Sequence, residues 1–336
     1  MHATQGDSVA LFDIPVRADI RHVAIGMFDG VHAGHRAVVG ELINAATVPA
    51  ASDISASPSA PPPAVSHHEG MAVMTFEPHP LSVIAPDRAP PRLTTPGQRR
   101  KLLLQAGASE VISVSFTPHT RDLSSSDFIS ELERIFPRLR TIVVGPGWTF
   151  GRDRAGNALT LNQRGATAGY RVMEVAPVMA GGLPLSSTRI REAIGNGNLL
   201  LAKEFLGRSH TLSGTVTHGR QNGRRIGFPT ANLGGVFQML PPFGVYATRA
   251  VIHGHGGHTV SIPSMTNIGI RPTIDDSATV SVEAHLLDFH QDIYGRELEL
   301  SLESFIRPER RFSGLDELKS QIKTDEVEAR RILTFI

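Results

Sequence analysis

The sequence predicts an α/β protein with a doubly wound parallel sheet, followed by a small antiparallel β-barrel and a C-terminal helix. In the first half, short apolar segments alternate with helical patterns, which is typical of a parallel sheet with helices on both faces. After about residue 210, helical periodicity gives way to short strands and turns whose spacing suits a closed barrel. The length of 336 residues is sufficient for two such domains.

The elements of the first half follow from local patterns. Apolar segments rich in Val and Ile are predicted as strands, and the segments between them have helical periodicity. The predicted strands are residues 21–28, 70–78, 110–116, 140–145 and 170–178, and the predicted helices are 34–46, 97–107 and 124–136. Serines and an aspartate at the start of the third helix are typical N-cap residues. Ligands of such sheets bind beyond the carboxyl ends of the strands, where the strand order reverses.

The second half contains five segments typical of barrel strands and one long helical pattern. The segments are residues 210–219, 244–254, 258–269, 279–289 and 296–306, and the helical pattern covers 314–335. This last pattern predicts either one amphipathic helix or a broken pair packed outside the barrel. We place the first domain at residues 1–190, a linker helix at 191–210 and the second domain at 211–336. Residues 46–70, dominated by Ala, Ser and Pro, are predicted to be a disordered surface insertion.

Composition excludes several classes of function. The formal net charge of +1 gives the whole chain no electrostatic reason to bind nucleic acid or an acidic membrane. The chain has no cysteine, which excludes disulfides and thiolate sites. No apolar stretch approaches the roughly 18 to 20 residues of a membrane span, and the start lacks the pattern of a secretory signal. We expect a soluble, cytoplasmic protein with neither nucleic acid nor membrane as partner, and a homo-oligomer is compatible with the sequence.

The first functional motif is "HAGH", which follows a predicted strand and opens a predicted helix. A helix N-terminus offers free backbone N–H groups and the positive end of the helix dipole, which favour phosphate. His32 and His35 are three residues apart and share one face of the first turn, while Gly34 leaves space for a nucleotide. The motif alone is weak evidence, because two histidines at a helix start also occur by chance.

The second motif, "LPLSSTRIREAIGNG", covers residues 183–197. Its run of hydroxyl side chains is a good helix cap, and Arg189 and Arg191 bring guanidinium groups that bind phosphate bidentately. The alternative is a well-capped surface helix with solvated arginines. Together, the two motifs resemble the HxGH and ISSTxxR signatures of nucleotidylyltransferases, which have Rossmann-like folds.

The wider sequence resembles the FMN adenylyltransferase module of prokaryotic bifunctional FAD synthetases. The matching segments are "GMFDGVHAGHR" (26–36), "MTFEPHPL" (74–81), "VVGPGWTFGRDRAGN" (143–157) and "LSSTRIRE" (185–192). The resemblance implies that His32, His35 and Arg191 act in catalysis as hydrogen-bond donors. It also implies ligand contacts at Gly26, Phe28, Asp29, Gly34, Ser186, Ser187 and Thr188.

The segment "GRQNGRRIGFPTANL" (219–233) is the most specific in the chain. It reads either as a Gly-rich hairpin or as a site in which Thr230 and Asn232, on one face of a strand, offer hard oxygen ligands to Mg²⁺. It closely resembles the riboflavin kinase signature, and companion motifs follow at 266–273, 282–289, 292–300 and 305–312. The resemblance implies that Glu283, otherwise one polar residue on an alternating strand, is the general base. It also implies ligand contacts at Gly223, Arg224, Gly227 and Pro229.

The resemblance implies two reactions. ATP and Mg²⁺ phosphorylate riboflavin to FMN, and a second ATP adenylylates FMN to FAD with release of pyrophosphate. Two other classes stay open, namely a riboflavin kinase with a weakened or inactive first domain and a flavin-binding protein without turnover. The intact Thr230, Asn232 and Glu283 argue against the latter.

The loop at 143–157 departs from the family pattern. The family usually carries Asn or Asp before the first aromatic residue, whereas this chain has Gly147 followed by Trp148, its only tryptophan. Trp148 is predicted either to stack on a ligand ring or to pack as an ordinary loop aromatic. Met27 stands where the family often has Asn. These departures bear on the efficiency of adenylylation more than on its existence.

Overall fold

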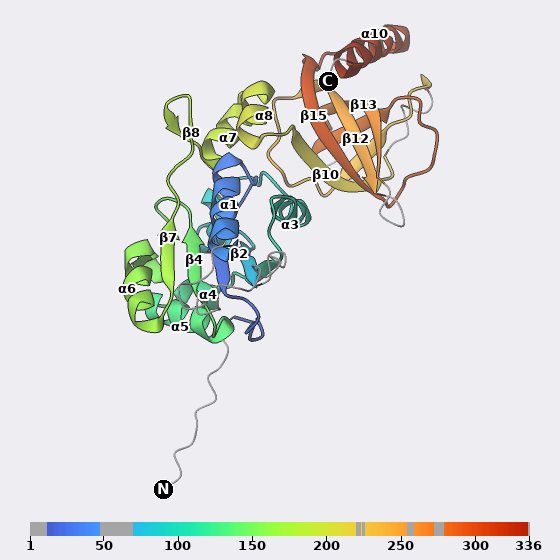
Figure 1. Cartoon of the computed structure of the whole chain (residues 1–336). Coiled ribbons are helices and arrows are strands. Elements are labelled where there is room, and N and C mark those ends of the chain that lie inside the picture. The colour runs from blue at the N-terminus through green and yellow to red at the C-terminus, as the bar shows by residue number, and fades with distance from the viewer. Residues whose placement is uncertain are drawn as a thin grey trace, which may run out of the picture. The chain divides into compact units, whose positions relative to one another are not determined.

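The computed structural model describes residues 12–47, 70–219, 223, 226–253, 259–271 and 279–334. The chain divides into two compact units, Met1–Pro90 with Pro96–Leu185 and Pro91–Thr95 with Ser186–Ile336 (Figure 1). The predicted fold class is confirmed, and the predicted domain limits stay predictions. Most of the predicted disordered insertion, residues 48–69, and the predicted site residue Arg224 lie outside the described residues.

The first unit contains β1 (His22–Ile25), α1 (Ala33–Thr47), β2 (Met71–Glu77), α2 (Pro80–Ile84), η2 (Pro86–Arg88), α3 (Pro96–Gln105), β3 (Val111–Ser115), α4 (Pro118–Asp122), α5 (Ser125–Ile135), β4 (Thr141–Val144), β5 (Thr149–Phe150), η3 (Arg152–Arg154), β6 (Gly156–Asn157), α6 (Ala158–Ala168), β7 (Arg171–Glu174), β8 (Met179–Ala180) and β9 (Leu183–Pro184). The second unit contains α7 (Ser187–Gly195), α8 (Leu199–Leu206), β10 (His210–Thr217), β11 (Ala231–Gly234), β12 (Gly244–His253), β13 (Thr259–Arg271), β14 (Thr279–Leu286), β15 (Glu297–Arg307) and α10 (Leu315–Thr334).

Five parallel strands in the described part of the first unit form a sheet in the order β3-β2-β1-β4-β7. The inner strands β2 and β4 are buried almost throughout, whereas the edge strand β3 alternates between buried and exposed residues. Burial on both faces explains the continuous apolar runs of the sequence. The strand order reverses between β1 and β4, so a ligand site is expected beyond the carboxyl ends of these two strands.

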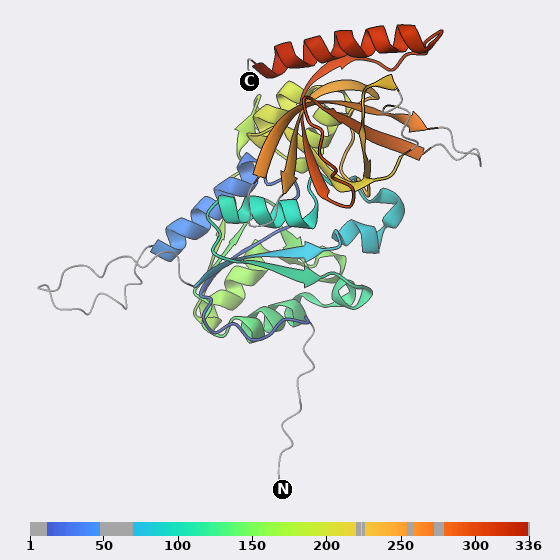
Figure 2. The same ribbon diagram turned by 90° about the vertical axis from the view of Figure 1, so that its right-hand side faces the viewer.

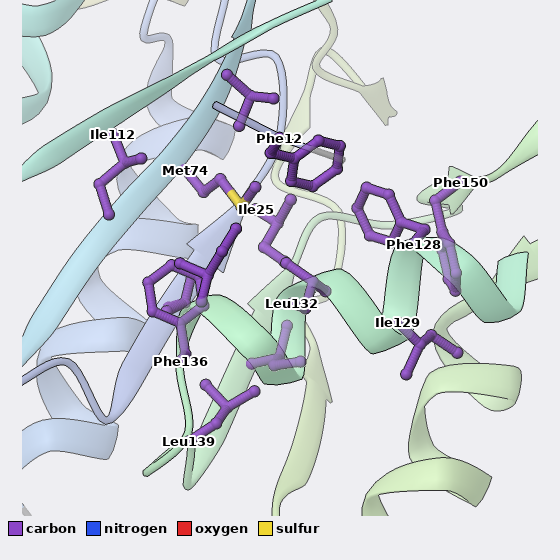
Figure 3. Close-up of a cluster of buried hydrophobic side chains, with 14 of the residues drawn as sticks. Phe12, Ile25, Met74, Ile112, Phe128, Ile129, Leu132, Phe136, Leu139 and Phe150 are labelled. Atoms are coloured by element: carbon purple, nitrogen blue, oxygen red, sulfur yellow. The ribbon is translucent and has the colours of Figure 1, made fainter. Parts of the chain in front are cut away.

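Helices cover both faces of this sheet (Figure 2). On one face, Val38 and Leu42 of α1 and Leu103 of α3 pack against the strands. On the other face, Phe128 and Leu132 of α5 join a larger cluster (Figure 3). The strand residues of that cluster include Val23, Ile25, Met74 and Val144. Each large apolar side chain buried in this way contributes about 1.5–3 kcal/mol, so these clusters hold the helices on the sheet.

The second unit is built around a closed antiparallel barrel with the strand order β10-β11-β14-β13-β12-β15. Alternate residues of the strands point inward and form its core, among them Leu212, Tyr246, Ile268, Val282 and Leu300. Closure pairs every strand on both sides and leaves no free sheet edge. The predicted barrel is therefore confirmed.

The helices of the second unit settle whether the C-terminal pattern is one helix or two, and they show that the region predicted as a single linker helix contains parts of two helices. The C-terminal pattern forms one continuous helix, α10, whose Ala329 and Leu333 pack on Ala247 and Met265 of the barrel. The region predicted as a linker helix contains the end of α7 and all of α8, because the chain turns at Gly197, where φ is 75°. Within the described ranges, every helix is too short or too polar to cross a membrane.

Candidate functional site

The turn between β1 and α1 has an unusual backbone. Phe28, Gly30 and Val31 all have positive φ, at 52°, 88° and 42°. Such a conformation costs a β-branched residue such as Val31 on the order of 1–3 kcal/mol. Burial offsets this cost, since the side chains of Phe28 and Val31 are only 2% and 1% exposed. Backbone strain of this kind is concentrated at ligand-binding sites, and this turn lies at the reversal point of the sheet.

The histidines predicted to bind phosphate lie side by side at the start of α1. The rings of His32 and His35 stack with centroids 3.7 Å apart, and His35 meets the edge of the Phe28 ring at 5.3 Å. The backbone N–H of Gly34 donates to Nδ1 of His32 at 3.1 Å, so a neutral His32 carries its proton on Nε2. Asp29 is buried in the same turn. The pair is thus oriented at a helix N-terminus, which favours anions.

Two residues that sequence reasoning did not select hold this turn, one from the sheet and one from α3. The Thr75 hydroxyl and Nη1 of Arg99 both donate to the carbonyl of Met27, at 3.1 Å and 3.4 Å. The N–H of Gly26 donates to the carbonyl of Met74 at 3.1 Å. Thr75 lies within the motif at 74–81, so the sequence could have indicated it as a site residue. Arg99 belongs to a helix whose sequence has no distinguishing pattern. Both side chains are buried and fix the loop that precedes the histidines.

Gly147, which stands where the family usually has Asn or Asp, has a left-handed backbone. Its φ is 66°, and its N–H donates to Oε1 of Glu174 at 2.7 Å. A methyl group on Gly147 would meet nothing within 4 Å, so the backbone conformation, and not space, restricts this position. Asn and Asp tolerate left-handed backbone better than most other residues, so glycine preserves the turn while losing the side chain.

Trp148 packs against its own loop and the core beneath it. Its ring stacks on Phe150 with centroids 4.9 Å apart and lies 6.1 Å from that of Phe128. This is the packing expected of a loop aromatic. Stacking of Trp148 on a ligand ring stays a prediction.

The hydroxyl run at 186–188 begins α7. Ser186 is the N-cap, with its side chain accepting from the N–H of Arg189 at 3.4 Å. Ser187 and Thr188 are the first two residues of the helix. The predicted helix cap is confirmed, and a helix N-terminus in general is suited to an anion.

The two arginines of α7 have partners within the second unit. The guanidinium of Arg189 lies 4.8 Å from the centre of the Phe205 ring, so it packs α7 on α8. Nε of Arg191 donates to the carbonyl of Pro91 at 2.7 Å. Their predicted contacts with phosphate stay predictions. Because the division between units falls at residues 185 and 186, the prediction that α7 and the histidine pair bind one ATP also stays a prediction.

Two cavities of the described second unit share Thr230 in their walls. The larger has a volume of about 280 Å³ and is also lined by Glu283, while the smaller, of about 80 Å³, is lined by Asn232. The Thr230 hydroxyl donates to Oε2 of Glu283 at 3.4 Å. The structure therefore brings together the predicted base and the predicted metal ligands around Thr230.

The barrel register produces this arrangement. Asn232 of β11 lies directly opposite Glu283 of β14, and Glu283 lies opposite Asn267 of β13. Opposite residues of neighbouring strands project from the same face, so these side chains gather at one place although they are distant in sequence. Thr230 immediately precedes β11 and continues the same row of alternate residues.

Glycines permit the close approach of the segment before β11. A methyl group on Gly219 would overlap the amide of Asn232, and one on Gly223 would overlap the carbonyl of Phe228. Gly227 has φ of 92°, which favours glycine. Gly223 and Thr230 line the larger cavity, whereas Pro229 lines the smaller one. The glycines predicted as ligand contacts therefore also shape the site.

His285 is a further residue of this site that sequence reasoning missed. Its Nδ1 lies 2.7 Å from the carbonyl of Pro229, and the edge of its ring meets Phe228 at 5.7 Å. It shares a face with Glu283 two residues earlier, so the motif at 282–289 contained the signal. His285 ties the segment before β11 to β14 and so maintains the contact between Thr230 and Glu283.

Comparison with known proteins covers both units. A family model described as FAD synthetase matches residues 17–189, and one described as riboflavin kinase matches residues 206–333. The bifunctional riboflavin kinase/FMN adenylyltransferase of Escherichia coli K12 is 37% identical over 92% of this chain and 91% of its own length. The Bacillus subtilis protein of the same name is 34% identical over the same shares. This chain belongs to the bifunctional riboflavin kinase/FMN adenylyltransferase family.

The family match spans both units, which does not favour the alternative of a kinase with a degraded first domain. A solved structure agrees with this extent. The crystal structure named as a macrolide-efflux protein from Streptococcus pneumoniae has a TM-score of 0.73 and 29% identity, and the match covers 95% of this chain and 96% of that one. The similarity of fold therefore includes the sheet, the barrel and the C-terminal helix.

The smaller cavity suits the Mg²⁺ that this family implies. Mg²⁺ prefers hard oxygen ligands and is commonly held by one or two protein groups together with substrate phosphates. Thr230 and Asn232 offer a hydroxyl and an amide oxygen, and Gly219 leaves the space that the amide occupies. In the part of the chain that the structure describes, His, Asp and Glu form no group of three placed to hold a metal. A cation at this site would therefore be shared with phosphate oxygens.

Proposed function

We propose that the chain makes FAD from riboflavin in two steps, each of which consumes one ATP. The observation that carries the proposal is the hydrogen bond between Thr230 and Glu283, since it places the proposed base beside a residue that lines both cavities. The family match over both units supports the second step.

In the first step, riboflavin occupies the larger cavity and ATP phosphates approach through the smaller one. The flavin ring is large and flat, and Val245, Met265 and Phe312 give the larger cavity the apolar wall that such a ring requires. The riboflavin 5′-hydroxyl attacks the γ-phosphate of ATP, its proton passes to Glu283, and ADP leaves. Thr230 orients Glu283 through its hydrogen bond.

Mg²⁺ is assigned to Thr230 and Asn232. When bound, the ion neutralises phosphate charge that develops during transfer. Thr230 lines both cavities and Asn232 lines the smaller one, so both residues border the space proposed for the phosphate end of ATP. Their positions depend on the barrel register and on the hydrogen bond of His285 to the Pro229 carbonyl.

In the second step, an oxygen of the FMN phosphate attacks the α-phosphate of ATP, the bond between the α- and β-phosphates breaks, and pyrophosphate leaves. A phosphate nucleophile is already ionised at neutral pH, so the step needs no strong base. We assign His32 and His35 as donors to the ATP phosphates, with Arg191 and the start of α7 as further phosphate contacts. These groups accelerate transfer by alignment and charge stabilisation.

The proposed partners are small molecules: ATP, riboflavin, FMN and FAD. We place the reaction in the cytoplasm and expect neither nucleic acid nor membrane as partner. A homo-oligomer stays compatible with the chain.

One assay tests the proposal. The purified full-length chain is incubated with riboflavin, ATP and Mg²⁺, and riboflavin, FMN and FAD are separated over time. We expect FMN to appear first and FAD to follow, and we expect EDTA to abolish FMN formation. FMN without FAD, with supplied FMN also left unconverted, would favour the monofunctional kinase. Flavin binding without either product would favour the non-catalytic alternative.

A further inference from the structure

Glu309 lies on a segment whose start is firmly held. Arg307, the last residue of β15, donates from Nε and Nη2 to the carboxylate of Asp325 at 2.9 Å and 2.8 Å. Its Nη1 donates to the carbonyl of Pro308 at 3.0 Å. Asp325 is 2% exposed on α10. A bidentate pair of this kind has a defined geometry, so it fixes the direction of the backbone that leads to Glu309.

The carboxylate of Glu309 lies against β13. Nδ2 of Asn267 donates to its Oε1 at 3.1 Å. A methyl group on Gly269 would overlap all three atoms of the carboxylate group, and those atoms are its nearest neighbours. Glycine at 269 therefore provides the space in which the carboxylate rests, and the motif at 266–273 acquires a physical reason for both its Asn and its Gly.

Position along β13 distinguishes two ends of the larger cavity. Met265, Asn267 and Gly269 are alternate residues and share one face of the strand. Met265 belongs to the apolar cluster against which Ile322 of α10 packs, and it marks the apolar end. Gly269, which lies next to the Glu309 carboxylate, is four residues from Met265 along the strand. Two residues of a strand span about 7 Å, so the separation is twice that length.

Asn267, between them, faces Glu283 across the register. Asn267, Glu283 and Glu309 all line the larger cavity and mark its polar end.

We propose that Glu309 accepts a hydrogen bond from the ribityl hydroxyls of riboflavin, an inference that rests on the proposed kinase function. Riboflavin has a flat ring at one end and a polyol chain at the other, and its 5′-hydroxyl must reach Glu283. The ring therefore lies toward Met265 and the ribityl chain toward Glu309. Among the described residues, the Glu309 carboxylate receives one hydrogen bond, from Asn267, which leaves Oε2 to accept from the ligand.

Binding without ATP tests this assignment directly. The full-length chain is titrated into riboflavin and, separately, into lumichrome, which has the ring system without the ribityl chain, and flavin fluorescence is followed. Glu309→Ala should raise the Kd for riboflavin by about 10- to 100-fold, the scale of one hydrogen bond to a charged group. The Kd for lumichrome should stay at the parent value.

Gly269→Ala provides a matched test that leaves the carboxylate in the protein. The new methyl group displaces Glu309, so this variant should weaken riboflavin binding to a similar extent. In the double variant with Glu309→Ala, the methyl group has space, and the Kd should equal that of Glu309→Ala alone. Gly314→Ala, whose methyl group would meet nothing within 4 Å, should match the parent.

The possible failures are separable. Parent-like riboflavin binding by Glu309→Ala would overturn the inference, and so would an equal loss of lumichrome binding, which would place Glu309 at the ring. Strictly additive losses in the double variant would show that Gly269 acts independently of Glu309 and would also contradict it. A parent protein that neither binds riboflavin nor forms FMN would instead overturn the proposed function.

Discussion

The hydroxyl of Thr230 donates to Oε2 of Glu283 at 3.4 Å, although the two residues are 53 positions apart in the chain. Thr230 precedes β11 and Glu283 lies in β14, and the register of these paired strands brings them together. Thr230 lies in the walls of both cavities. This contact places the proposed base beside a residue that borders both proposed substrate cavities.

Glu283→Gln should lower the rate of FMN formation by about two to four orders of magnitude, because glutamine keeps the size and the hydrogen bond to Thr230 but cannot take up the proton. The initial rate with saturating riboflavin and ATP measures the effect. Conversion of supplied FMN to FAD serves as the internal control and should be unchanged. A parent-like rate of FMN formation would remove Glu283 from the role of base.

Asn232→Ala should reduce FMN formation at least about tenfold and raise the Mg²⁺ concentration needed for half-maximal rate, because the variant loses one proposed oxygen ligand. The rate is measured across a Mg²⁺ titration. Supplied FMN should still be adenylylated. If the variant phosphorylates riboflavin at the parent rate with the parent Mg²⁺ dependence, the metal assignment is wrong.

His35→Ala should lower FAD formation from FMN by about one to three orders of magnitude, the scale of losing one charge-stabilising donor. Riboflavin phosphorylation should be nearly intact, since His35 lies in the first unit. Both activities are measured on the same preparation. An equal loss of the two activities would contradict the assignment of two separate sites.

Gly147→Asn should restore the polar side chain that the family usually carries and raise kcat/KM for FMN adenylylation, with thermal stability close to that of the parent. Asn tolerates the φ of 66°, and no atom lies within 4 Å of the new Cβ. Gly147→Val is the matched control: its β-branched side chain should destabilise the protein by about 1–2 kcal/mol at the same backbone. An unchanged or lower kcat/KM in the Asn variant would show that the missing group is not limiting.

His22 should make stability fall at mildly acidic pH. Burial, together with Arg140, Arg171 and Arg21, lowers the pKa of His22 to about 4, whereas a histidine in the unfolded chain titrates near pH 6.5. Between these values the unfolded chain binds a proton that the native chain does not, so stability decreases as pH falls. We expect His22→Leu to reduce the loss between pH 7 and pH 5 by on the order of 1 kcal/mol, since the site is partly exposed.

Urea unfolding of the parent and the His22→Leu variant at both pH values measures this difference. The two proteins should have similar urea midpoints at pH 7. Between pH 7 and pH 5, the midpoint of the variant should fall less than that of the parent. An identical pH dependence in the two proteins would show that His22 does not contribute.

Much of the fold could be predicted because its signals are local. The apolar runs of β1, β2 and β4 and the serine cap of α5 are read within a few residues. The histidine pair and the Pro-Thr-Ala-Asn segment were found in the same way, from spacing and resemblance. The packing partners of those segments could not be found, because each is supplied by a distant part of the chain.

The sequence by itself determined the α/β class, the barrel and the residue types at both sites, since periodicity and motif spacing depend only on neighbours in the chain. Only the tertiary structure decided that Arg99 supports the turn before His32, that Arg189 stacks on Phe205, and that Gly269 makes room for Glu309. The physical reason is that strand register and helix packing bring distant residues together, and those contacts depend on the whole fold.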